Sequence, residues 1–113
     1  MSDIVDLTFL NSFTGGNRDK NSKYIKMFLQ NAPTLMGSME ENLKKEDWAN
    51  LKSSAHSLKP QISYMGIKSA EELIKNIERD ASEKTNLENI SERITTLKNI
   101  LAEAYPELEK ASQ

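Results

Sequence analysis

Apolar residues recur at intervals of three and four along most of the chain, which is the spacing of one face of an α-helix. The clearest case is the stretch 47–66, where Asp47 is a suitable N-cap and Gly66 a suitable helix stop. The apolar positions of this stretch are Trp48, Leu51, Ala55, Leu58, Ile62 and Met65. We therefore predict a helix that buries this face in a core.

The same periodicity marks four further segments, which polar or glycine-containing turns separate. They are a short helix from about Leu7 to Phe13, a long helix over 18–45, and helices over 67–81 and 87–108. No run of β-branched residues alternates with the period of two that a half-buried strand shows. The sequence therefore predicts an all-α fold, an antiparallel up-down four-helix bundle with a short N-terminal helix.

Two prolines are expected to disturb these helices. Pro33 should kink the long helix or divide it into two, because proline removes one backbone hydrogen bond and crowds the preceding turn. Pro106 should weaken the last helix, so that residues 109–113 are expected to be frayed. At 113 residues, the chain is predicted to form one domain, residues 1–113.

Composition excludes several classes of function. The net charge is −2 with lysines and acids interspersed, so no nucleic-acid partner is expected. The absence of cysteine excludes disulfides, thiol catalysis and cysteine-based zinc sites. No apolar run approaches the roughly 20 residues of a membrane span, and the first residues lack the basic segment followed by an apolar one that is typical of a signal peptide. Gly15–Gly16 lacks the lysine-serine pattern of a phosphate loop, so ATP binding is not expected. We expect a cytoplasmic protein without a membrane partner.

His56 is the only histidine, so any imidazole chemistry takes place there. At about 100° per residue, it lies roughly 130° from the centre of the apolar face and therefore points to solvent. Lys52 lies one turn before it and Lys59 three residues after it, so both are neighbours on the helix surface. Their charge disfavours protonation of the ring and stabilises negative charge on its nitrogen. Such a histidine suits accepting and donating a phosphoryl group.

The run AHSLKPQISYMG resembles the signature of histidine-containing phosphotransfer (HPt) domains, approximately A-H-x-L-K-G-x-x-x-x-x-G. The residues that fall on this signature are Ala55, His56, Leu58, Lys59 and Gly66. The following run, IKSAEELIKNIE, resembles the amphipathic helix that comes next in that family. One position departs from the signature, because Pro60 stands where the family has glycine. In the family, this glycine is understood to leave room for a receiver to approach the histidine. We expect proline to keep this clearance, to bend the helix slightly, and to leave the His56 carbonyl facing solvent.

The resemblance implies a phosphorelay intermediate. His56 would accept a phosphoryl group from a receiver-domain aspartate of a hybrid sensor kinase and pass it to the aspartate of another receiver. The chain would be a phosphohistidine carrier rather than an enzyme, without a cofactor of its own, because the divalent metal is expected in the receiver. Its expected partners are these receiver domains, and it is expected to be a monomer. A start at Met1 and a frayed end favour a free-standing protein over part of a kinase.

Helix geometry adds one candidate to the site. If the helix of His56 and the next helix run antiparallel and turn near Gly66, His56 faces Glu78. A carboxylate there can accept from Nδ1–H, fix the tautomer and leave Nε2 as the nucleophile. Some HPt-like domains, notably those of chemotaxis kinases, have a glutamate in that place. The alternative is an ordinary surface glutamate on an acidic helix.

Further candidates surround the histidine. Lys52, Pro60 and Gln61 are expected beside the phosphoryl group, and Gln61 and Lys75 are the weaker candidates. The apolar residues expected to dock a receiver are Phe9, Phe13 and Tyr64, although each of them can instead belong to the core.

Two other functions compete with the carrier. One is a helical adaptor that binds partners through a hydrophobic face, with His56 incidental. The other is a metal site of His56 and Glu78, which has too few ligands to close a zinc site.

Overall fold

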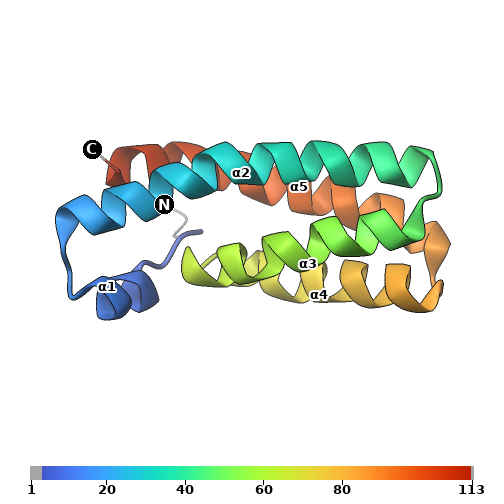
Figure 1. Cartoon of the computed structure of the whole chain (residues 1–113), viewed down its shortest axis with the longest axis horizontal. Helices are drawn as coiled ribbons and strands as arrows, with labels where there is room; N and C mark the ends of the chain where they lie inside the picture. Colours follow the sequence, from blue (N-terminus) through green and yellow to red (C-terminus); the bar gives the residue numbers. More distant parts are fainter. Residues whose placement is uncertain (1–3, 113) are drawn as a thin grey trace.

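The computed structural model describes residues 4–112, which form five α-helices and no strand (Figure 1). The helices are α1 (Thr8–Thr14), α2 (Arg18–Lys44), α3 (Trp48–Tyr64), α4 (Lys68–Glu83) and α5 (Leu87–Ala111). The four long helices lie antiparallel, and the main contacts join α2 to α3, α3 to α4, α4 to α5 and α5 to α2. The predicted all-α bundle with a short N-terminal helix is confirmed.

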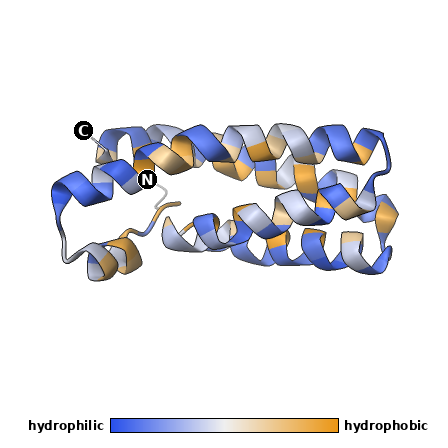
Figure 2. Cartoon of the chain, in the orientation of Figure 1, coloured by the Kyte–Doolittle hydropathy of each residue, from blue (hydrophilic) through white to orange (hydrophobic). Residues whose placement is uncertain are grey.

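The core runs along the centre of this bundle. Figure 2 shows that apolar and polar residues alternate along each long helix, which gives every helix an apolar side. The largest fully buried side chains are Phe28, Ile25, Met39, Leu51, Leu58, Ile62, Ile67, Ile74, Ile77, Ile90, Leu97 and Leu101. Those of α3 belong to the face that periodicity predicts, so the phase of α3 is as expected.

Neither Pro33 nor Pro106 ends its helix, so the division of α2 into two helices and the fraying that begins at residue 109 are wrong, whereas the kink expected at Pro33 stays a prediction. α2 passes through Pro33 as one helix, and α5 passes through Pro106 to Ala111, so residues 109–111 are not frayed. Both prolines are exposed while buried neighbours such as Met36 and Leu108 fix the helix on the core. Burial of such side chains offsets the roughly 3 kcal/mol cost of an interior proline. Residue 113 lies outside the described residues.

The N-terminal segment lies across the end of the bundle at which α2 begins (Figure 1). The backbone N–H of Val5 donates to Glu107 Oε2 on α5 at 3.1 Å, and that of Asp6 donates to the Gly66 carbonyl at 3.2 Å. Leu10 of α1 is buried in the core. Asn21 of α2 donates from Nδ2 to Asn11 Oδ1 at 2.6 Å. Polar and apolar contacts therefore hold α1 against the bundle.

The helix of His56 begins and ends at the predicted residues. Asp47 accepts from the backbone N–H of Asn50 at 3.2 Å, as an N-cap does. At the other end Gly66 has φ +65°, and the N–H groups of Gly66 and Ile67 donate to the carbonyls of Ser63 and Ile62. A Cβ at Gly66 would lie 1.8 Å from the carbonyl oxygen of Asp6. Glycine is therefore needed here both for the turn and for the passage of the N-terminal segment.

A buried ion pair, not predicted from sequence, fixes α4 against α5. Asp80 is 0% exposed and its carboxylate accepts from Arg93 on α5. Thr85 Oγ1 and Asn86 Nδ2, in the turn between the helices, donate to the same carboxylate at 3.3 and 3.4 Å. Glu78 lies two residues before Asp80 on the same helix, so the pair anchors the part of α4 that carries Glu78.

Candidate functional site

The site is built on the exposed side of α3. His56 lies between the buried residues Ala55 and Leu58, yet its own side chain is 68% exposed. This is the phase that the apolar stripe of α3 requires, because one residue turns the helix by about 100°. The imidazole is thus accessible to a large partner while its helix is anchored in the core.

The ring of His56 is held by a carboxylate of the neighbouring helix. Nδ1 lies 2.6 Å from Glu78 Oε2, and the other carboxylate oxygen, Oε1, accepts from Lys59 Nζ at 2.6 Å. The side chain of Glu78 is 15% exposed and that of Lys59 is 35% exposed. Glu78 therefore connects the histidine to the lysine, and it faces His56 as the antiparallel hairpin predicts.

The charge state of Glu78 determines which ring nitrogen is available. Burial raises the pKa of Glu78. The hydrogen bonds and charges of Lys59 and His56 lower it by more than burial raises it, so the pKa lies below its usual value. The carboxylate is therefore ionised at neutral pH and can only accept hydrogen bonds. Nδ1 of the neutral ring consequently carries the hydrogen, and Nε2 presents its lone pair on the opposite side of the ring.

This arrangement corrects the electrostatic argument made from the lysines alone. Lys59 does not act on the ring as an isolated charge, because Glu78 accepts from it and compensates it locally. Sequence reasoning treated the two lysines alike, whereas Lys52 is exposed and forms no ion pair with any of residues 4–112. The site is thus a triad of His56, Glu78 and Lys59 with Lys52 at its edge.

The remaining candidates near the histidine lie one turn further along α3 or across on α4. Pro60 is exposed on the side of α3 that carries His56. Gln61 donates from Nε2 to the backbone carbonyl of Ser57 at 3.1 Å, so its amide is turned to its own helix. Lys75 on α4 is exposed.

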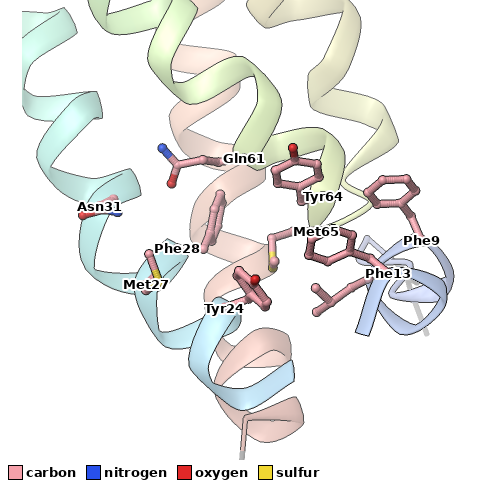
Figure 3. Close-up of a pocket in the computed structure, with 10 residues that line it drawn as sticks. Phe9, Phe13, Tyr24, Met27, Phe28, Asn31, Gln61, Tyr64 and Met65 are labelled. Atoms are coloured by element: carbon pink, nitrogen blue, oxygen red, sulfur yellow. The ribbon is translucent and has the colours of Figure 1, made fainter. Parts of the chain in front are cut away.

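Three aromatic residues expected at a docking surface form one cluster. Phe9, Phe13 and Tyr64 are 51%, 65% and 49% exposed, so the alternative that Phe13 belongs to the core is wrong. The rings of Phe9 and Tyr64 stack with centroids 5.5 Å apart, and those of Phe13 and Tyr64 with centroids 6.5 Å apart (Figure 3). These rings join α1 to the end of α3, about 12 Å along the helix from His56.

The second wall of this surface was missed by sequence reasoning. Tyr24 and Met27 project from α2 and are 37% and 46% exposed. With the three rings they border a hollow of about 360 Å³ whose other lining includes Gln61. We call Phe9, Phe13, Tyr24, Met27 and Tyr64 the aromatic patch. Neither Tyr24 nor Met27 was among the residues that the sequence predicted for the docking surface.

A metal site and a membrane span are two features for which the described residues can be searched. No group of three or more His, Cys, Asp or Glu side chains that could hold a metal ion occurs among residues 4–112. None of the helices described is long and apolar enough to span a bilayer. His56 and Glu78 alone give a metal only two ligands, fewer than the three protein ligands of catalytic zinc sites.

Comparison with known proteins identifies the family. The family model for the Hpt domain matches residues 23–108, which include α3, α4 and most of α2 and α5, but not α1. No curated protein and no solved structure matches the chain. Hpt domains are phosphocarrier modules that interact with receiver domains. The chain therefore belongs to the Hpt domain family and has a phosphotransfer-carrying role in two-component signalling.

Proposed function

We propose that the chain is a phosphorelay intermediate whose phosphoryl acceptor is Nε2 of His56. The donor is the phospho-aspartate of a receiver domain in a hybrid sensor kinase, and the acceptor is the aspartate of a second receiver. The observation that carries this proposal is the 2.6 Å contact between Nδ1 and Glu78 on a ring that is 68% exposed. It leaves one nitrogen nucleophilic and open to a partner.

The transfer is a displacement at phosphorus. The lone pair of Nε2 forms the P–N bond while the P–O bond to the receiver aspartate breaks, and the carboxylate leaves with the electron pair. The ring becomes positively charged as the bond forms, and the Glu78 carboxylate at Nδ1–H stabilises this charge. Transfer to the second receiver reverses these steps with its aspartate as the nucleophile. The divalent metal that assists the reaction is expected in the receiver.

Lys59 stabilises the phosphoryl group in this mechanism. An ammonium has three N–H donors, and Lys59 uses one of them for Glu78. The others can bond phosphoryl oxygens while the bond to Glu78 remains. Lys52, one turn before His56 and without an ion pair in the described chain, adds positive charge on the N-terminal side of the ring.

The partner approaches over Pro60 and the aromatic patch. Pro60 lies one turn beyond His56 on α3. Its compact ring leaves space for a partner to reach the imidazole. Phe9, Phe13 and Tyr64 expose apolar surface near the C-terminal end of α3, beyond Pro60. Exposed apolar clusters of this kind mark interaction sites. The docked receiver would thus cover the ends of α1 and α3 while its aspartate reaches Nε2.

A phosphotransfer profile against the receivers of the same organism tests the proposal. The chain should acquire an acid-labile, base-stable label from at least one phosphorylated receiver, and the His56→Gln variant should acquire none. The rival function, a helical adaptor with His56 incidental, predicts receiver binding without label. Receivers that bind the chain but never label it would favour the adaptor.

A further inference from the structure

Positive and negative charges are segregated between the two sides of the bundle. From residue 20 to residue 39, α2 carries three lysines and no acidic residue. Residues 48–70, which include all of α3, also contain lysines and no acidic residue. From residue 71 onward acidic residues outnumber basic ones, so the acids that make the net charge −2 concentrate on α4 and α5. The side that carries His56 is therefore positive in a protein that is negative overall.

Two of these lysines border the aromatic patch. Lys20 and Lys23 line a shallow hollow on α2 together with Phe13, Tyr24 and Met27. Both are exposed, and neither forms an ion pair with the residues that the structure describes. Their charge is therefore available to a partner.

Acidic residues lie on both sides of the patch: on α2 the exposed Asp19 precedes Lys20 and is outnumbered by Lys20 and Lys23, and two further acids lie beyond the patch on the other side. Asp6 and Glu71 border a separate hollow beyond the stacked rings of Phe9 and Tyr64. The carboxylate of Asp6 already faces Lys68 at 3.8 Å. The α2 edge of the patch is thus positive, and the edge toward α4 is mixed. This asymmetry gives a docked partner a preferred orientation.

We propose that the α2 edge of the aromatic patch, with Lys20 and Lys23, docks receiver domains whose contact surface has an apolar centre and an acidic rim. The receiver as occupant rests on the proposed function, and the acidic rim follows from the positive charges of Lys20 and Lys23. The hollow of about 360 Å³ accepts an apolar side chain of the partner. The lysines act at longer range, over the roughly 10 Å Debye length at 0.1 M salt.

Charge at the rim of an interface acts chiefly on the rate of encounter. Oppositely charged rims raise the association rate and make it depend on salt, while the apolar centre controls dissociation. Lys20 and Lys23 should therefore select among receivers by how fast each one docks. Because both the donor and the acceptor receiver must reach Nε2, both would use this edge.

Association kinetics of the His56→Gln variant test the inference without the chemistry. Each receiver of the organism is mixed with this variant in a stopped-flow instrument, with Lys20→Glu or Lys26→Glu added. Lys26 is the matched control, because it is an exposed lysine of the same helix, about 120° around it from Lys20. Lys20→Glu should lower the association rate of the best-binding receiver about 10-fold at about 0.1 M salt, and Lys26→Glu should lower it clearly less because Lys26 does not border the aromatic patch. The difference should vanish near 1 M salt, where the Debye length is about 3 Å.

The outcomes separate this inference from the proposed function. Equal association rates for the two charge reversals would overturn the inference, even if the unmutated chain is labelled on histidine. A selective, salt-dependent effect of Lys20→Glu in a chain that no receiver labels would support the inference and remove the phosphoryl-carrier proposal. A panel in which no receiver binds would overturn both.

Discussion

Replacement of Glu78 by Gln examines the site with the smallest change of shape. The carboxylate accepts from two donors, His56 on one oxygen and Lys59 on the other. A glutamine offers one acceptor oxygen and one NH₂ donor. If the oxygen faces His56, the NH₂ meets the ammonium of Lys59, and that bond is lost. If the oxygen faces Lys59, the NH₂ donates to Nδ1, and the hydrogen of the neutral ring moves to Nε2, the proposed nucleophile.

Either arrangement removes one charge-assisted hydrogen bond. Such bonds contribute about 1.5–3 kcal/mol, and each 1.36 kcal/mol corresponds to a factor of about ten in rate. We therefore expect Glu78→Gln to slow phosphotransfer from a phosphorylated receiver by roughly 10-fold to 100-fold. The bundle should remain folded, because Glu78 is not part of the apolar core.

The assay is a single-turnover transfer measured beside circular dichroism, with Glu72→Gln as the control. Glu72 is an exposed acid of α4 about 120° around the helix from Glu78, so it points away from His56. Glu72→Gln changes the net charge by the same amount as Glu78→Gln. The control should transfer at the wild-type rate. A Glu78→Gln variant that transfers as fast as this control would refute the role given to the carboxylate.

The remaining predictions concern stability and access. Gly66→Ala should lower the free energy of unfolding by more than the roughly 1–2 kcal/mol that a left-handed backbone costs a residue with a Cβ, because the alanine Cβ would collide with the backbone of Asp6. Urea unfolding measures this change. A change below about 0.5 kcal/mol would contradict the close approach of the two backbones. Asp80→Ala should cost about 3–5 kcal/mol in the same assay because Arg93 loses its buried partner; a loss below 1 kcal/mol would show that water replaces the carboxylate. Pro60→Gly should preserve transfer and Pro60→Arg should block it without unfolding the bundle, so normal transfer by the arginine variant would refute the clearance argument. The pKa of Glu78 is lowered in the folded state, so the contribution of its carboxylate to stability is present above the ordinary pKa of 4.5 and lost as pH falls below it. The difference in unfolding free energy between wild type and Glu78→Gln should therefore shrink from pH 7 to about pH 3. A difference that stays constant with pH would contradict this.

Local signals made α3 and its partner across the hairpin predictable. Asp47 and Gly66 act through the backbone of their own turns, so a helix bounded by them can be read without a structure. Given those bounds, the antiparallel hairpin alone brings Glu78 opposite His56, and the 2.6 Å contact follows. Here the relevant geometry lies within one helical hairpin.

Features that depend on the whole bundle could not be predicted in this way. Pro33 and Pro106 carry a strong local signal against helix, but burial of their neighbours in the core overrides it. Tyr24 lies at the edge of the apolar stripe of α2, and only the position of α1 decides that it borders the aromatic patch. Asp80 resembles any acid of α4 until α5 brings Arg93 to it.

The central claim, a phosphoryl group on Nε2 of His56 with Nδ1 bonded to Glu78, is open to one direct measurement. The chain labelled with ¹⁵N at histidine is phosphorylated by a cognate receiver and observed by ¹⁵N and ³¹P NMR. We predict ¹⁵N–³¹P coupling at Nε2 alone, a protonated Nδ1 whose shift moves in Glu78→Gln, and no phosphoryl signal in His56→Gln. Coupling at Nδ1, or a phosphoryl signal that persists in His56→Gln, would contradict the account.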